Sequence, residues 1–174
     1  RGRRAHLQAS PEVEDMKVEE VLAKSQMFAG LSLEDIYDVA RISREQAHRQ
    51  GETIFQEGEE AHNLYILVQG KVSLEMCIPQ PAARGPMRSC EIRVVAPGAS
   101  FGWSAVVDPY VYTLSARCVE ACRSVAIDGA RLRDLMESNH HIGYRVLKRL
   151  SATVSSRLKD TSQTMASERG LAFL

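Results

Sequence analysis

The residues best suited to chemistry lie in one loop between Phe101 and Ser115. Trp103, Tyr110 and Tyr112 lie there with the hydroxyl residues Thr113 and Ser115. Small-molecule pockets commonly combine aromatic side chains with a few polar groups. The same aromatic residues could instead fill the interior, because large apolar side chains are more often core than ligand wall. Both interpretations stay open for the sequence.

Patterns for catalysis or metal binding are weak. The sequence has no Walker phosphate loop and no His-x-x-x-His or Cys-x-x-Cys pair. His62 lies beside Glu59 and Glu60, but an isolated histidine in such a turn is expected to be exposed rather than a ligand. We therefore expect no enzyme, no metal site and no cofactor. A cupin-like metal enzyme is the least favoured alternative.

The cysteines point to a reduced environment. Cys118 and Cys122 would stand about 13 Å apart on one strand, which is too far for a disulfide. The basic N-terminus has no apolar stretch behind it, so it does not resemble a secretory signal. We expect a cytoplasmic protein with reduced cysteines.

Size and charge narrow the partners. The chain has 174 residues, which suits one domain with flanking helices. Lys plus Arg is 22 and Asp plus Glu is 22, so no net field attracts nucleic acid or an anionic membrane. No apolar run approaches the roughly 18 residues of a membrane span. We expect no direct nucleic-acid partner and no membrane partner.

The hydrophobic period changes twice along the chain. Apolar residues recur at helical spacing before Ile42 and after Asp128, and short strands with glycine-containing turns lie between. The predicted fold is α+β: an antiparallel β-roll (double-stranded β-helix, or jelly roll) with N-terminal helices and a long C-terminal helix. The predicted segments are a disordered tail over 1–15, helices over 16–41, the roll over 42–128, C-terminal helices over 129–160 and a tail over 161–174.

Five segments carry a family resemblance. They are residues 28–36 (FAGLSLEDI), 51–59 (GETIFQEGE), 64–72 (LYILVQGKV), 101–102 (FG) and 126–128 (AID). In this order and spacing they resemble the cyclic-nucleotide-binding domain, the sensor half of the catabolite-activator / fumarate-nitrate-regulator (Crp/Fnr) superfamily. The resemblance implies that residues from Phe101 onward form a phosphate-binding cassette with a short helix. The candidate ligand-binding residues that it implies are Phe101, Gly102, Trp103, Ser104, Ala105, Tyr112, Thr113 and Ser115. It also implies a cytoplasmic signalling role.

This sequence departs from the cassette pattern at the two positions that contact ligand. The family places a Glu after Phe-Gly and an Arg further on, where this chain has Trp103 and Tyr112. A charge-assisted hydrogen bond contributes roughly 1.5–3 kcal/mol. Losing both weakens cyclic-nucleotide affinity by about three orders of magnitude. The cassette is therefore degenerate, and cyclic AMP is not the expected ligand.

The C-terminal helix has an apolar face and a basic face. Leu147, Leu150 and Val154 alternate by three and four, as a coiled-coil seam does, and predict a homodimer. Arg145, Lys148, Arg149, Arg157 and Lys159 are interpreted as a solvated face. About fifteen residues follow, so no DNA-binding domain is expected.

The predicted function is a regulatory or sensor module that binds a small effector other than cyclic AMP, or no nucleotide. The alternatives are a true cyclic-nucleotide-binding signalling protein and a ligand-free interaction scaffold. A scaffold would dock a protein partner through the Pro/Gly-rich loop 79–86 or the loop at Pro109.

Overall fold

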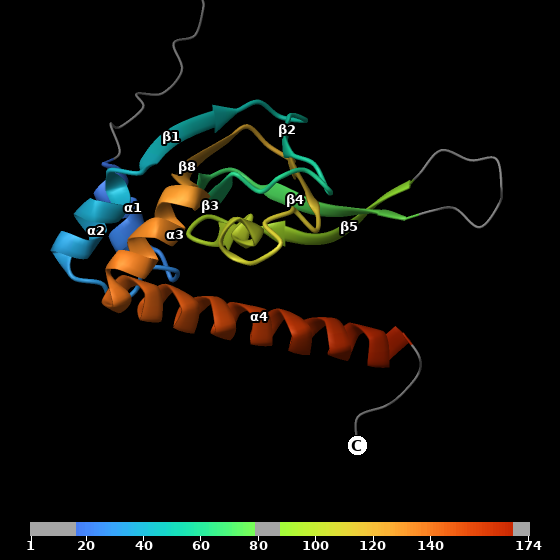
Figure 1. The fold of residues 1–174 in the computed structure, drawn as a ribbon. Coiled ribbons are helices and arrows are strands. Elements are labelled where there is room, and N and C mark those ends of the chain that lie inside the picture. Colours follow the sequence, from blue (N-terminus) through green and yellow to red (C-terminus); the bar gives the residue numbers. More distant parts are fainter. Residues whose placement is uncertain (1–16, 79–87, 169–174) are drawn as a thin grey trace, which may run out of the picture.

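The computed structural model describes residues 17–78 and 88–168, drawn as a coloured ribbon in Figure 1. The helices are α1 (Val18–Lys24), α2 (Leu33–Ala40), α3 (Gly129–Ser138), α4 (His140–Glu168) and the short 3-10 helix η1 (Trp103–Val106). The strands are β1 (Ser43–His48), β2 (Thr53–Phe55), β3 (Asn63–Gln69), β4 (Val72–Ile78), β5 (Arg88–Val95), β6 (Ser100–Phe101), β7 (Ser115–Cys118) and β8 (Cys122–Asp128). The predicted tail over 1–15 and the predicted docking loop 79–86 lie outside the described residues.

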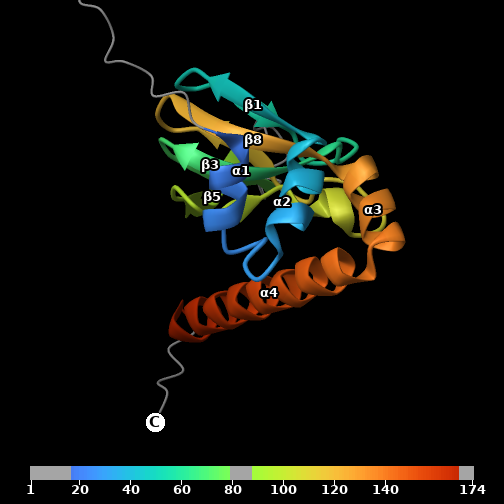
Figure 2. The same ribbon diagram turned by 90° about the vertical axis from the view of Figure 1, so that its left-hand side faces the viewer.

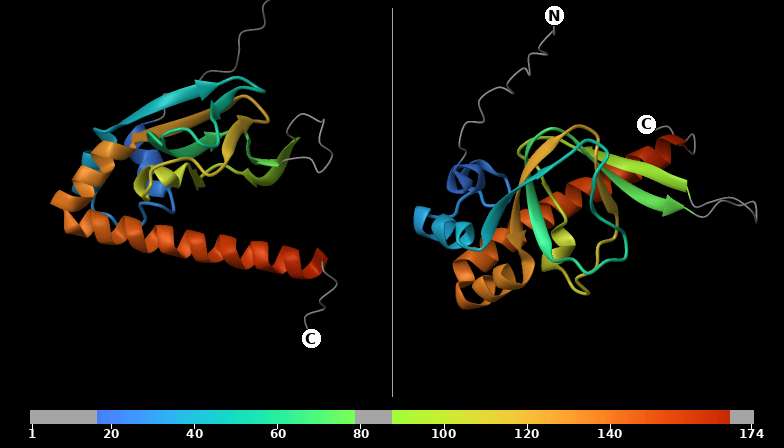
Figure 3. Two further views of the ribbon diagram at one scale, coloured as in Figure 1. Left: turned by 45° about the vertical axis from the view of Figure 1, so that its right-hand side comes forward. Right: turned by 90° about the horizontal axis from the view of Figure 1, so that it is seen from above.

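The strands form two antiparallel four-stranded sheets. One has the order β1-β8-β3-β6 and the other the order β2-β7-β4-β5. Apart from the β4–β5 hairpin, successive strands alternate between the two sheets, and together they curl around a common interior (Figure 3). This arrangement confirms the predicted β-roll with helices before and after it.

Strand β3 is the centre of the roll. Its residues 64–67 are all buried, because it pairs with β8 and β6 while helix α1 contacts it. A glycine-marked turn joins it to β4. Gly70 has a φ of +86°, and a Cβ there would lie 2.4 Å from the carbonyl oxygen of Ala121. Only glycine combines a positive φ with the absence of a Cβ atom, and this turn requires both.

The helices begin where the sequence supplies caps. Ser32 and Asp35 form a capping box at the start of α2, and the Asp128 carboxylate accepts a hydrogen bond from the Arg131 N–H at 3.0 Å at the start of α3. Helices α1 and α2 cover the side of the roll that carries β1, β8 and β3 (Figure 2). The N-terminal helices are thus part of the same core.

Helix α4 is longer than the sequence predicts. It has 29 residues and spans about 44 Å, so the predicted tail is wrong for residues 161–168, which are helical. Its apolar period fades after Leu158, so spacing alone could not extend it. No helix in the described parts of the chain is long and apolar enough to cross a membrane.

The cysteine geometry also differs from expectation. Cys118 ends β7 and Cys122 begins β8, so they do not share a strand as the 13 Å separation assumed. Both are free and buried. Burial and the neighbouring Cys122 thiol raise the pKa of Cys118 to about 12. Such a thiol stays protonated and unreactive.

Candidate functional site

The predicted cassette begins at the end of β6. Phe101 is fully buried, and Gly102 follows with a φ of +72°. A Cβ at Gly102 would lie 3.0 Å from the carbonyl oxygen of Asn63 and 3.1 Å from the Tyr65 ring. The chain then enters the 3-10 helix that starts at Trp103. Glycine therefore lets the backbone press against β3 before the short helix begins.

Four aromatic rings fill the roll behind this loop. The ring centroids of Phe55 and Tyr112 are 3.7 Å apart, those of Tyr65 and Phe101 are 5.0 Å apart, and Phe55 lies 5.7 Å from Tyr65. Aromatic pairs at such distances stabilise beyond their buried area. The rings come from β2, β3, β6 and the loop before β7, so the stack joins both sheets.

Tyr112 is tied to β3 by its hydroxyl. The hydroxyl donates to the carbonyl oxygen of Asn63 at 2.9 Å and accepts from the N–H of Asn63 at 3.1 Å. Burial raises the pKa of Tyr112 far above its usual value. At the position where the family resemblance implies a cation, this chain thus has a neutral, fully engaged phenol.

Little empty space remains beside the cassette. A cavity of about 30 Å³ lies there, which is the volume share of one water molecule. Ligand pockets for small molecules usually enclose about 300–1,000 Å³. The cavity is lined by Phe55, Leu74, Gly102, Trp103, Ser104, Tyr112, Thr113, Leu114 and Arg157.

Five predicted site residues meet at this cavity: Gly102, Trp103, Ser104, Tyr112 and Thr113. The others have structural contacts elsewhere. Phe101 joins the aromatic stack, and the Ser115 hydroxyl accepts from the Glu57 N–H at 3.0 Å. The carbonyl of Ala105 accepts from the Arg133 guanidinium at 2.5 Å.

Arg157 is the residue that the sequence interpretation misplaced. The sequence places it on a solvated face, but in the structure it is partly buried between α4 and the cassette. Its guanidinium carbon lies 5.6 Å from the centre of the Trp103 ring, and its Nη2 donates to the carbonyl of Ser100 at 3.1 Å. Helical spacing in the sequence could have placed Arg157 on the inward face of α4. Val146, Leu150 and Thr153 precede it on that face, at intervals of four, three and four.

The electrostatics of Arg157 are unfavourable. Its Nε is buried and has no hydrogen-bond partner in the described part of the chain. Burial lowers the pKa of Arg157, and the neighbouring Arg93 lowers it further. A cation in this position is short of negative partners.

The predicted dimer seam needs one correction. Leu150 is only 5% exposed and packs in the core, whereas Leu147 and Val154 are exposed. The outward apolar stripe instead comprises Tyr144, Leu147, Val154, Leu158 and Met165. Leu150 turns inward because it follows Ile142 and Val146 at intervals of four on the buried face.

Other candidate sites do not assemble. Residues 98–102 (GASFG) match the Gly-x-Ser-x-Gly spacing of hydrolases, a motif that the sequence interpretation missed. Ser100, however, opens a two-residue strand paired with Ile66 rather than a strand-to-helix elbow. His62 lies 3.9 Å from Glu60 on the surface. Within residues 17–78 and 88–168, no three His, Cys, Asp or Glu side chains are grouped to hold a metal ion.

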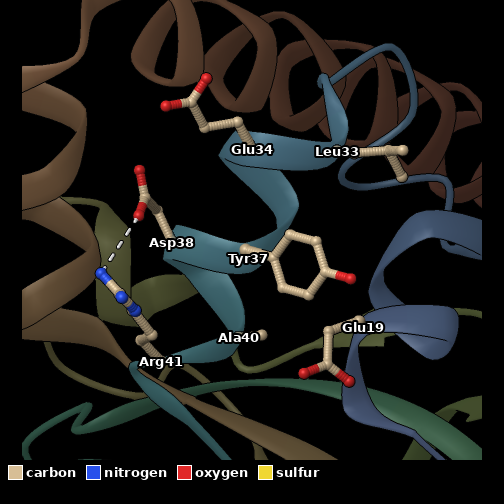
Figure 4. A pocket seen from close by; sticks show the side chains of 7 residues that line it. All are labelled: Glu19, Leu33, Glu34, Tyr37, Asp38, Ala40 and Arg41. Carbon is tan, nitrogen blue, oxygen red and sulfur yellow. Dashed lines mark ion pairs between the residues drawn. The ribbon is translucent and has the colours of Figure 1, made fainter.

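Another hollow lies away from the cassette, between α1 and α2. It encloses about 670 Å³ and is lined by Glu19, Leu33, Glu34, Tyr37, Asp38, Ala40 and Arg41. Figure 4 shows its three carboxylates spread apart rather than converging, and Asp38 faces Arg41 at 3.9 Å. This arrangement has no polar groups focused on one ligand.

Fold and cassette together define the class of this protein as a β-roll domain with flanking helices, and comparison with known proteins agrees. The sequence model of the cyclic nucleotide-binding domain matches residues 45–139. The chain therefore belongs to the cyclic nucleotide-binding domain family, of the Crp/Fnr type.

Three relatives illustrate the relationship. A Geobacter metallireducens protein assigned as a cyclic nucleotide-binding protein is 36% identical, covers 82% of this chain and 99% of its own, and superposes with a TM-score of 0.70. The Thermus thermophilus catabolite activator protein shares the fold, at 23% identity and a TM-score of 0.64, with 83% of this chain and 63% of its own covered. A CRP-like cAMP-activated global transcriptional regulator of Mycobacterium tuberculosis is 27% identical over 149 residues, which cover 86% of this chain. The matched region spans 62% of that regulator's length.

Proposed function

We propose that this chain is a regulatory module whose cassette no longer takes cyclic AMP or cyclic GMP as an effector. The cavity of about 30 Å³ beside Trp103 is the observation that carries the proposal. The family fold and the short helix after Gly102 are present, but Trp103 and Tyr112 occupy the two positions where the family resemblance implies ligand contacts. A filled cassette favours an interaction module over a sensor of a small molecule in this loop.

Isothermal titration with cyclic AMP and cyclic GMP tests the proposal. The expected result is no binding tighter than millimolar, since two charge-assisted contacts are absent. A cooperative thermal transition of the same sample would serve as the control for a folded protein. Micromolar binding of either nucleotide would overturn the proposal.

We also propose that the module forms a homodimer through α4. The outward residues at 144, 147, 151, 154, 158, 161 and 165 alternate by three and four, as in a coiled coil, and five of the seven are large and apolar. A two-fold pairing of such stripes would remove their apolar surface from water.

The oligomeric state of matched variants tests the dimer. Light scattering at tens of micromolar is expected to give twice the chain mass for the unaltered protein and the single mass for Leu158→Glu. Ser155→Glu adds the same charge outside the stripe and is expected to stay dimeric. A monomeric unaltered protein would contradict the proposal, as would equal effects of the two variants.

A further inference from the structure

A second, basic hollow lies on the other side of Arg157, between α4 and the turn that leads into β6. We call it the arginine groove. It encloses about 270 Å³ and is separate from the cassette cavity. It is lined by three arginines (Arg93, Arg149 and Arg157), three hydroxyl residues (Ser100, Thr153 and Ser156), and Gln26, Met27, Ala99 and Ala152.

Positive charge in the arginine groove exceeds negative charge. No carboxylate lines it. Among the described residues, the one carboxylate that forms an ion pair with an arginine of the groove is that of Asp160, which lies 2.6 Å from Arg93. Arg149 and Arg157 make no ion pair with any described residue. Three guanidiniums against one carboxylate leave a net positive hollow.

Arg157 supplies a donor without an acceptor. One of its nitrogens, Nη2, bonds the Ser100 carbonyl, but Nε is buried and unpartnered. A buried donor without an acceptor costs free energy, and two like charges near each other cost more. An anion in the groove would relieve both costs. The lowered pKa of Arg157, caused by burial and then by Arg93, agrees with this geometry.

The shape and chemistry of the arginine groove restrict its ligand. Guanidiniums are planar forks that match the oxygens of a phosphate group, and hydroxyls add further donors. The volume is too small for a large cofactor but suits a compact anion. We infer that the arginine groove binds a small phosphate-bearing anion, held by Arg93, Arg149 and Arg157. This site goes beyond the proposed function and does not depend on whether the cassette binds a nucleotide.

Titration of the full chain with inorganic pyrophosphate and inorganic phosphate at constant ionic strength tests the site. The expected result is saturable binding of one pyrophosphate per chain by calorimetry, with a rise in melting temperature because the anion bridges α4 to β5 and β6. No saturable binding up to about 10 mM of either probe would overturn the inference.

Matched charge removals on α4 separate a site from a general salt effect. Arg149→Gln and Arg157→Gln are each expected to weaken pyrophosphate binding roughly tenfold to hundredfold. Lys148→Gln removes the same charge from the same helix outside the groove and is expected to change affinity less than about twofold. Equal losses in Lys148→Gln and Arg149→Gln would contradict a built site. Arg149 is exposed, so its variant remains informative if Arg157→Gln fails to fold.

Discussion

The cassette and the arginine groove share Arg157 but differ in how their side chains are satisfied. In the cassette, four stacked rings and a doubly bonded tyrosine leave only about 30 Å³ empty. In the arginine groove, three arginines line a hollow of about 270 Å³, and one carboxylate, that of Asp160, pairs with Arg93. Tight packing stabilises a fold but removes room for a ligand, whereas unpaired charge leaves capacity to bind one. We therefore place the proposed anion site beside the cassette rather than in it.

The largest effect is expected for a cavity made in the aromatic stack. Phe101→Ala should lower the free energy of unfolding by about 3–5 kcal/mol, because removal of the buried ring abolishes its packing contacts and leaves a cavity. Urea unfolding measures this. Tyr37→Ala truncates an exposed aromatic side chain on α2, away from the cassette and from the outward stripe of α4; it is the control and should change stability by less than about 0.5 kcal/mol. A small loss in Phe101→Ala would show that the cassette is not a packed core.

Removal of one hydroxyl tests how firmly Tyr112 closes the cassette. Tyr112→Phe keeps the ring in the stack but leaves the partly buried N–H and carbonyl of Asn63 without this partner. The expected loss is about 1–3 kcal/mol in the free energy of unfolding. Hydrogen exchange at the Asn63 amide should quicken in parallel. Unchanged exchange at Asn63 would argue against the observed hydrogen bond.

The contact between the start of α4 and helix α2 should weaken in acid. The cassette and the arginine groove both depend on the position of α4. Asp35 accepts hydrogen bonds from Asn139 at 3.0 Å and lies 3.0 Å from the His141 ring nitrogen. Burial works to raise the pKa of Asp35, but hydrogen bonds from Ser32, His141 and Asn139 outweigh it and lower the pKa.

Because the folded pKa of Asp35 is lowered, its contribution to stability is present above the unfolded value near 4 and is lost as pH falls through the folded value. Asp35→Asn should therefore cost about 1–2 kcal/mol at pH 6 and less near pH 3. Urea unfolding at both pH values measures the difference. A cost that does not shrink in acid would show that charge is not the cause.

The smallest effect on stability is expected in the arginine groove. Arg149→Gln should change the free energy of unfolding by less than about 0.5 kcal/mol in buffer without phosphate, because its side chain is exposed and makes no ion pair among the described residues. Thermal unfolding with and without pyrophosphate measures this. A large loss without anion would mean that Arg149 is a structural residue.

Local patterns in the sequence predicted most of the fold. The Ser32 and Asp128 caps, the turn at Gly70 and the return to helical spacing after Asp128 each depend on neighbours a few residues away. The end of α4 was predicted too early, because Met165 is the single large apolar residue in 161–168 and one such residue does not define a helical period. Phe101 and Gly102 located the cassette from their type and order alone.

Tertiary structure decided what the cassette and α4 can do. Whether Trp103 and Tyr112 line a pocket or fill it depends on Phe55, Tyr65 and Arg157, which lie far away in the sequence. The inward direction of Leu150 and Arg157 depends on which face of α4 meets the roll, and helical spacing leaves that choice open until the helix is docked. The pairing of Arg93 with Asp160, and the excess charge that remains beside it, likewise arise only when β5 and α4 come together. Short-range spacing therefore specifies elements, while the occupancy of a site is set by side chains that meet only in the folded chain.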